Sequence, residues 1–189
     1  MNKENLTNND SNDIILNAGE VSKDTPRTNE EGSVQLRSPA PNLTAEDIKT
    51  FEVKLVTRKE ISDFIEKWHY SHNMNGLMHT YCFGLYRKGE LIGAAVFGQP
   101  ATPGVAEAYS NNRERKIIEL RRLVLIDDTP RNSESYFIGR MIRYLKKSTD
   151  EELILSYADT THGHEGIVYK ATNFTCIGKS PAVKKILSN

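Results

Sequence analysis

Apolar and polar positions follow a clear period only after about residue 46, so the pattern separates a polar leader from a structured remainder. The first periodic segment carries apolar residues at helical spacing, at Ile61, Phe64, Ile65 and Trp68. Thr57 and Glu60 precede this stripe at the spacing of a capping box, in which two residues satisfy each other's backbone donors. The pattern predicts a helix that begins near Thr57 and ends near Trp68.

The following segments predict strands and two further helices. TYCFGLYRKGELIGAAVFG alternates around a turn at Gly89 and predicts a hairpin, and KIIELRRLVLI predicts a third strand. An apolar stripe predicts a helix over residues 134–147. LILSYAD, HEGIVYKAT and FTCIGK predict a strand, a helix and a final strand. The resulting order, α-β-β-β-α-β-α-β, predicts one domain of the α+β or α/β class.

Composition changes this picture mainly at the N-terminus. Residues 1–46 are rich in Asn, Ser, Thr, Glu and Pro, so we expect a disordered polar tail, followed by one folded domain over residues 47–189. The tail has eight acidic and four basic residues, whereas the remainder has 17 acidic and 21 basic ones. The basic excess is compatible with a nucleic-acid partner without requiring one.

Targeting and redox signals are weak. The chain has no run of about 18 apolar residues and no signal-peptide pattern, so we expect a soluble, cytoplasmic protein without a membrane partner. Cys82 and Cys176 do not have the spacing of a redox or zinc motif, and we expect both to be buried free thiols.

The polar loop DDTPRNSES connects a predicted strand to a predicted helix. Ligands of open α/β sheets bind at the carboxyl ends of strands, and the amide groups at a helix start favour anions. The loop therefore offers candidate phosphate ligands at Arg131, Asn132, Ser133, Glu134 and Ser135. The alternative is an ordinary helix cap formed by Asn132 or Ser133, which the local sequence slightly favours.

Several of these motifs together resemble a known family. The element order and VYKATNF resemble the GNAT superfamily of N-acyltransferases, with Asn173 in place of the usual turn glycine. WHYSH, ELRRLVLIDDTPRNSES and LSYADTTHGHEGIVYKATNFTCIG are, in this order, similar to the Mom family of phage adenine-modifying proteins. The resemblance covers about residues 60–180. It implies a GNAT-like mixed, twisted sheet flanked by helices.

The resemblance also implies an activity. Mom-like proteins convert adenine in phage DNA to an N6-acylated, methylcarbamoyl-type form that protects the genome from host restriction, and an acyl-CoA donor and iron have been proposed for the family. This chain departs from GNAT enzymes at the pyrophosphate loop, where RNSES replaces the glycines. Glu134 would repel a pyrophosphate there, so the departure puts conventional acetyl-CoA use in doubt.

Candidate catalytic residues follow from the chemistry of a weakly nucleophilic exocyclic amine. Asp159 is our candidate proton acceptor or hydrogen-bond partner for that amine, and Tyr169 is a candidate proton donor to a departing thiolate. His69 and Tyr70, from WHYSH, are candidate active-site residues, the first as a base and the second as a stacking surface. The alternatives are a turn cap for Asp159 and simple ring packing for Tyr169.

Histidine spacing offers a possible metal site. His69 and His72 lie three positions apart, and His162 and His164 follow Asp159 closely. If these loops converge, imidazoles and a carboxylate would suit iron or zinc, although neither pair forms a known motif.

DNA contact requires cations and aromatic rings near the site. Arg113, Arg115 and Lys116, with Tyr109 nearby, are candidate DNA contacts, and a solvated loop is the alternative. Arg121 and Arg122 should face opposite sides of their strand, and we favour Arg122 as the residue facing the site.

Three functional hypotheses result. The first is an enzyme that acylates the N6 amine of a flipped or single-stranded adenine in DNA. The second is a GNAT-like acyltransferase for a small molecule or a protein amine, and the absent glycine loop counts against it. The third is a catalytically inert nucleic-acid-binding relative, and the presence of Asp159, Tyr169 and WHYSH counts against it.

Overall fold

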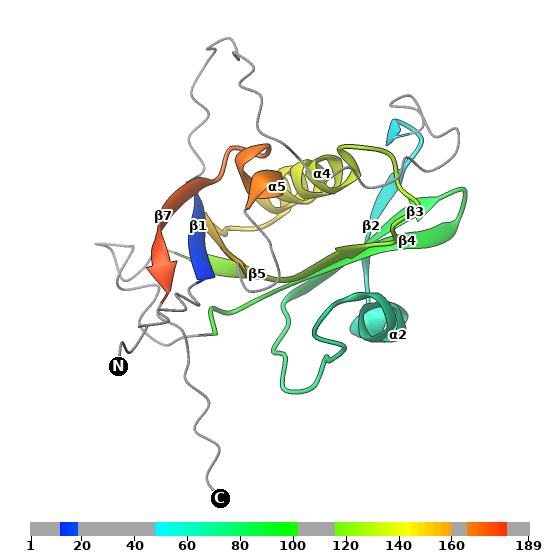
Figure 1. Ribbon diagram of the computed structural model, residues 1–189, viewed down its shortest axis with the longest axis horizontal. Coiled ribbons are helices and arrows are strands. Elements are labelled where there is room, and N and C mark those ends of the chain that lie inside the picture. The colour runs from blue at the N-terminus through cyan, green and yellow to red at the C-terminus, as the bar shows by residue number, and fades with distance from the viewer. Residues whose placement is uncertain (1–11, 19–47, 102–115, 160–165, 181–189) are drawn as a thin grey trace, which may run out of the picture.

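A computed structural model describes residues 12–18, 48–101, 116–159 and 166–180 of the chain. The strands of these segments form one sheet in the order β2-β3-β4-β5-β6-β1-β7 (Figure 1). The strands are β1 (Asn12–Ala18), β2 (Glu52–Val56), β3 (Tyr81–Arg87), β4 (Glu90–Gly98), β5 (Ile117–Leu125), β6 (Leu153–Ala158) and β7 (Thr175–Ser180). The helices are α2 (Arg58–Trp68), α4 (Ser133–Ser148) and the single-turn α5 (Ile167–Lys170).

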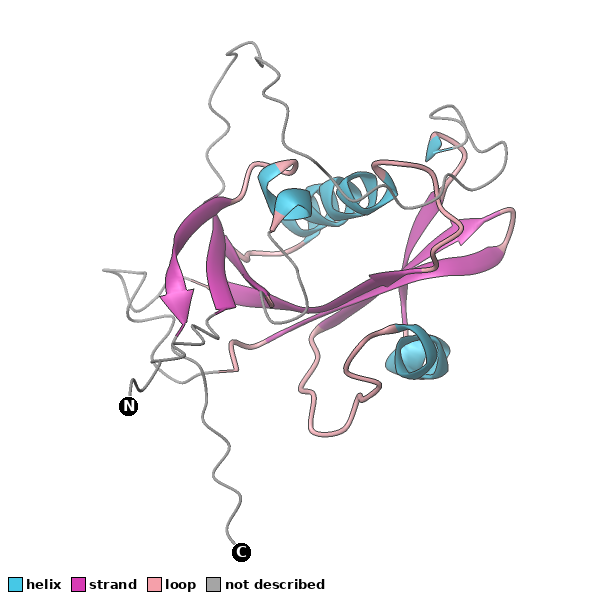
Figure 2. Cartoon of the chain, viewed as in Figure 1, coloured by secondary structure: helices cyan, strands magenta, loops and turns pink. Residues whose placement is uncertain are grey.

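Helices cover both faces of the sheet (Figure 2). On one face, α2 packs on the hairpin strands through its fully buried Ile61 and Ile65. On the other face, α4 packs its buried Phe137, Met141 and Leu145 into the larger core. Each helix buries most of the stripe that its sequence period predicts, with Trp68 at the end of α2 as an exception, so the sheet is shielded on both sides.

The middle of the sheet has the feature that creates a site. β5 and β6 pair in parallel, while every other pair of neighbouring strands in the described sheet is antiparallel. The parallel pairing ends at Leu120 and Ser156, although β5 continues to Leu125 along β4 and β6 continues to Ala158 along β1. The two strands therefore separate toward their carboxyl ends and leave a gap between them.

The predicted fold class is confirmed, and so are the boundaries of the two long helices to within about a residue. The predicted capping box is also present, because the Glu60 carboxylate accepts hydrogen bonds of 2.7 Å from the backbone N–H and the hydroxyl of Thr57. Among the described residues, no helix combines the length and the apolar character needed to cross a membrane.

Two strands were not predicted. β2 precedes α2 at one edge of the sheet, and Asn12–Ala18, which the composition assigns to the polar tail, forms β1 between β6 and β7. The apolar run DIILN lies within β1. Its backbone pairs on both sides with strands far away in the sequence, so long-range pairing outweighs the polar composition around it. The prediction of a uniformly disordered tail is therefore wrong for this segment.

Candidate active site

A cleft of about 430 Å³ lies where β5 and β6 separate. Its walls come from the end of α2, the carboxyl ends of β5 and β6, the start of α4, and α5. All four predicted catalytic residues line it: His69, Tyr70, Asp159 and Tyr169. Residues about a hundred positions apart in the sequence thus meet at one place, at the carboxyl ends of parallel strands where α/β sheets bind ligands.

A β-bulge in β5 brings two arginines to this cleft. Along β4, Val96 pairs with Arg122 while the next residue, Phe97, pairs with Leu120, so Arg121 is an extra residue without its own position in the ladder. Leu120 and Leu123 both pack in the core beneath α4, although residues three positions apart in a regular strand face opposite sides of the sheet. Arg121 and Arg122 both line the cleft. The prediction that only one of them faces the site is wrong, because a bulge breaks strand alternation.

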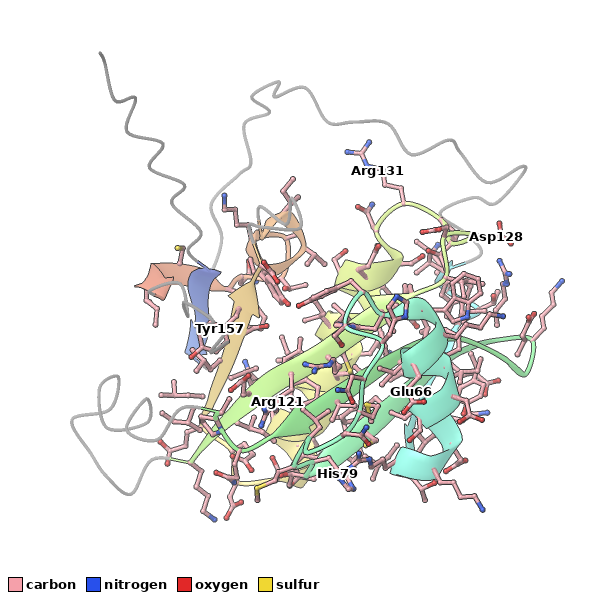
Figure 3. The ribbon with its side chains drawn as sticks, turned by 60° about the horizontal axis from the view of Figure 1, so that its bottom comes forward. Glu66, His79, Arg121, Asp128, Arg131 and Tyr157 are labelled. Carbon is pink, nitrogen blue, oxygen red and sulfur yellow. The ribbon has the colours of Figure 1, made fainter. Side chains whose placement is uncertain are left out.

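The two guanidinium groups have different local partners. Arg121 donates to the Gln99 carbonyl oxygen at 3.2 Å, and its Nε lies 3.9 Å from the buried Glu119 carboxylate. Arg122 donates to the Arg121 carbonyl oxygen at 2.7 Å, and burial lowers the pKa of its guanidinium. Among the described residues, the buried Nε atoms of both arginines have no hydrogen-bond partner. Buried donors without acceptors are uncommon in folded proteins. Figure 3 shows Arg121 on β5 and Tyr157 on β6 on the face that carries α2.

The end of α2 positions the WHYS residues. His69 follows the helix in an extended conformation, and its N–H donates to the Ile65 carbonyl oxygen at 2.9 Å. The His69 ring is buried, and its Nδ1 accepts a hydrogen bond from the Ser71 N–H at 3.1 Å. Because Nδ1 accepts, the neutral ring carries its proton on Nε2. The ring also lies 4.3 Å from the Tyr70 ring, centroid to centroid, which holds both rings at the cleft.

Contacts with Arg58 and Gly98 hold the loop after α2 in place. Arg58, at the start of α2, donates from Nη1 to the Leu77 carbonyl oxygen at 3.0 Å and from Nη2 to the carbonyl oxygen of Met74. Gly98, at the end of β4, lies so close to this loop that a Cβ would overlap the Met78 carbonyl oxygen. The loop that carries Tyr70 therefore has a fixed path, although most of it lies outside regular structure.

Tyr70 and Asp159 form the central polar pair of the cleft. The Tyr70 side chain is hydrogen-bonded to Asp159, so the end of α2 is connected to the end of β6. Partial burial raises the pKa of the Tyr70 phenol, the charge of Asp159 raises it further, and the Arg122 guanidinium acts in the opposite direction. The phenol therefore stays protonated and donates to the carboxylate at neutral pH.

Tyr169 lies on the opposite wall, in α5. Burial raises the pKa of its phenol, while a hydrogen bond with Ser156 acts in the opposite direction. Its ring packs at 5.4 Å from Phe174, which follows a left-handed turn at Asn173 with a φ of 64°. Asn173, which stands where the GNAT pattern has a turn glycine, is thus left-handed, and this conformation directs the chain from α5 into β7.

The start of α4 uses most of its polar groups on its own backbone. The buried Ser133 donates its hydroxyl to the Pro130 carbonyl oxygen at 2.7 Å, and Ser135 donates to the Asn132 carbonyl oxygen at 3.0 Å. Asn132 is left-handed, with a φ of 73°, and its side chain makes no capping hydrogen bond. Arg131 is exposed and projects away from the fold (Figure 3). Of the five predicted cofactor ligands, only Glu134 lines the cleft.

This wall fits an acyl-CoA pyrophosphate poorly. Glu134 and Asp127 both line the cleft there, and two carboxylates oppose a bound anion. The neighbouring Asp128 does not line the cleft, because Arg87 holds its carboxylate at 3.2 Å and its carbonyl oxygen at 3.1 Å.

The other predicted ligands are not brought to the cleft. Lys116 lies before β5, at the opposite end of the strand from the gap, in an ion pair with Asp150. The Nδ1 of His72 is hydrogen-bonded to the Glu66 carbonyl oxygen at 2.8 Å. Within the described segments, no three His, Cys, Asp or Glu side chains form a group that could hold a metal. The remaining candidates lie outside the described residues: Tyr109, Arg113, Arg115, His162 and His164.

Sequence reasoning missed four polar or aromatic residues that line the cleft: Trp68, Arg121, Asp127 and Tyr157. Arg121 depends on the bulge, for which the sequence has no signal. Tyr157 directly precedes Ala158 and Asp159 in the SYAD motif, so its place in the motif could have identified it. Trp68 continues the helical stripe of α2 and was assigned to it, and Asp127, in the DDTPRNSES loop, was not among the candidate phosphate ligands.

The sequence model of the Mom protein family matches residues 50–186. The chain is 35% identical over 120 residues to "Methylcarbamoylase mom" of Escherichia phage Mu, a match that covers 60% of this chain and 48% of that protein. The chain thus spans about half the length of this relative.

Two solved structures have a similar fold. A GCN5-related N-acetyltransferase from Kribbella flavida has a TM-score of 0.51 at 8% identity, over 89% of this chain and 55% of the other. An aminoglycoside acetyltransferase from an uncultured soil metagenomic sample has a TM-score of 0.48 at 11% identity, over 74% and 98%. At such identities the likeness concerns the fold alone, and the first of these structures supports the GNAT architecture.

Proposed function

This chain belongs to the Mom protein family, and from that premise we propose that it is a transferase that modifies the N6 amine of adenine in DNA. The observation that carries the proposal is the hydrogen-bonded pair of Tyr70 and Asp159, with the Arg122 guanidinium near it, in a cleft formed by the splayed strands. The methylcarbamoyl-type nature of the added group and protection from restriction are part of the same proposal.

Asp159 is the residue we assign to the adenine amine. The N6 lone pair is delocalised into the ring, so the amine attacks well only when its proton is accepted as the new bond forms. In this proposal a bond forms between N6 and the donor carbon, the bond to the leaving group breaks, and the N6 proton passes to Asp159. Tyr70 donates to the other lone pairs of the carboxylate and fixes its direction.

Tyr169 and the arginines complete the proposed assignment. The raised pKa of Tyr169 keeps its phenol protonated, so it can donate a proton to the leaving group from the wall opposite the β5 arginines. Arg121 and Arg122 line the cleft, and their guanidinium groups can hold an oxygen atom of the donor or of a DNA phosphate. Because the α4 wall fits a pyrophosphate poorly, no step is assigned to coenzyme A.

Mass spectrometry of nucleosides tests the proposal. DNA from cells that express the protein should contain a heavier deoxyadenosine, and that nucleoside should disappear with Asp159→Asn. The matched control is Asp63→Asn, which changes an exposed carboxylate on α2 outside the cleft and should leave the nucleoside unchanged. Unmodified DNA in cells with abundant, folded wild-type protein would contradict the proposal. Modification of a small-molecule amine instead would support the general acyltransferase alternative.

A further inference from the structure

Trp68 does not behave as its sequence position predicts. It continues the apolar stripe of α2 at the spacing of Ile61 and Ile65, both of which are fully buried. Trp68 is nevertheless 42% exposed and lines the cleft. A large aromatic side chain that is exposed to water adds little to the stability of the fold. Its position beside the cleft therefore indicates a role in binding.

The local backbone explains the exposure. α2 ends at Trp68, and the extended conformation of His69 turns the His69 ring into the protein. In extended backbone successive side chains point to opposite sides, so the residues before and after His69 both point outward. Tyr70 is 47% exposed and also lines the cleft. Two aromatic rings therefore stand at the cleft, with a buried ring between them in the sequence.

The surroundings of Trp68 favour a nucleobase as its partner. The Lys67 ammonium lies 4.7 Å from the Trp68 ring centroid, and the guanidinium groups of Arg121 and Arg122 line the same cleft. Aromatic rings beside cations are the combination by which proteins hold single-stranded nucleic acid, because bases stack on the rings while the cations attract phosphates. A neutral apolar partner would gain nothing from these charges.

We propose that Trp68 is the stacking platform for a nucleobase next to the target adenine. The proposal rests on the proposed function, since it assumes an adenine at Asp159. Trp68 is a positioning residue in this account: it binds the strand and touches no reacting atom. It follows that the enzyme prefers a flipped or single-stranded adenine with a base beside it.

The chain contains a single tryptophan, so its fluorescence reports on this position alone. The probe is a short single-stranded oligonucleotide with one central adenine, and its binding is followed independently by the anisotropy of an attached dye. Quenching of Trp68 fluorescence should follow the same binding curve. Trp68→Ala should weaken binding by about 5-fold to 100-fold, the range that stacking of one base provides, and Trp68→Phe should restore much of it.

A second probe separates stacking from charge. An oligonucleotide of equal charge with abasic positions on both sides of the adenine should bind wild-type protein and Trp68→Ala equally, without quenching. Leu55→Ala, which changes an exposed apolar residue on β2, is the matched control and should leave binding unchanged. In turnover, Trp68→Ala should raise KM for DNA and leave kcat nearly unchanged.

The outcomes distinguish this inference from the proposed function. Oligonucleotide binding without quenching, and with equal affinity for the wild-type protein and Trp68→Ala, would overturn the role of Trp68 and leave the proposed function standing. Equal losses on the intact and the abasic oligonucleotides would also overturn it, because the effect would then not come from a base. Absence of any binding by the wild-type protein would overturn both.

Discussion

The end of α2 and the start of α4 both border the cleft and both are rich in polar and aromatic residues, but the structure uses them differently. At the end of α2, Tyr70 reaches across the cleft to Asp159. At the start of α4, Ser133 and Ser135 donate to backbone carbonyl oxygens within three residues of themselves. A polar helix start therefore becomes a ligand site only if its polar groups remain available after the hydrogen-bonding groups of the local backbone are satisfied.

The two regions also differ in how they are held. Arg58 of α2 holds the loop after α2 by donating hydrogen bonds to the Leu77 and Met74 carbonyl oxygens. Arg87 of β3 holds the loop before α4 by donating hydrogen bonds to Asp128. The first anchor leaves Tyr70 directed into the cleft. The second fixes the loop while Arg131 remains outside it. The Ser133 and Ser135 hydroxyls at the start of α4 therefore bond to the local backbone, and Arg131 does not line the cleft.

The largest expected effect is at Asp159, the residue at the end of β6 to which Tyr70 on the α2 side is hydrogen-bonded. Asp159→Asn removes the proposed proton acceptor and keeps its shape, so the initial rate of adenine modification should fall by about 10²-fold to 10⁴-fold. The measurement is the rate on a single-stranded oligonucleotide with purified protein. A loss below about threefold would show that the carboxylate is only a turn cap.

The packing beneath α2 can be tested apart from its chemistry. Burial raises the pKa of the Cys82 thiol from 9.0 to about 11, and this residue lies in the core that supports Ile61 and Ile65. The folded state holds the thiol proton more tightly, so the contribution to stability is complete below pH 9.0 and is lost as pH rises toward about 11. The loss should amount to about 3 kcal/mol in the free energy of unfolding.

Denaturant unfolding at a series of pH values measures this effect. Cys82→Ala should flatten the decline over that window, whereas Cys176→Ala, at an exposed position, should keep it. An unchanged decline in Cys82→Ala would show that other groups cause it.

Tyr70→Phe tests the α2 side of the cleft by removing a single oxygen atom. It removes the hydrogen bond to Asp159 and keeps the ring, so the rate should fall by about tenfold because the carboxylate loses its direction. Ser135→Ala removes the matching hydroxyl on the α4 side, and its rate should stay within about twofold of the wild type. Equal losses in the two variants would break the distinction between the two regions.

The smallest expected effect is structural. Ser133→Ala removes the donor to the Pro130 carbonyl oxygen in a buried setting and should lower the free energy of unfolding by about 1 kcal/mol. The rate per folded molecule should not change. A lost rate with unchanged stability would instead assign Ser133 to ligand binding.

The sequence predicted those parts of the fold that local patterns determine. The capping box at Thr57 and the apolar stripe of α4 depend on neighbours within a few residues, and both are present. β1 was missed because its pairing with β6 and β7 joins segments more than a hundred residues apart. The bulge at Arg121 was missed because it depends on the register between β4 and β5 rather than on any local signal.

The candidate site, like the fold, could be predicted only in part from the sequence. The motif resemblance selected His69, Tyr70, Asp159 and Tyr169, and the structure brings all four to one cleft. It also selected the polar run before α4, where residue types alone cannot separate a cap from a cradle. Trp68 was missed for a different reason. A helical stripe predicts which face of the helix a residue occupies, but not whether the core extends as far as that residue.

The most direct test of the central claim is the ratio of modified to unmodified deoxyadenosine in DNA from cells that express either Asp159→Asn or Glu134→Gln at equal levels of folded protein. Both variants neutralise a carboxylate that lines the cleft, one at the end of β6 and one at the start of α4. The account predicts that Glu134→Gln keeps the modification within about threefold of the wild type and that Asp159→Asn lowers it by at least about a hundredfold. Wild-type modification in Asp159→Asn, with loss in Glu134→Gln, would contradict it.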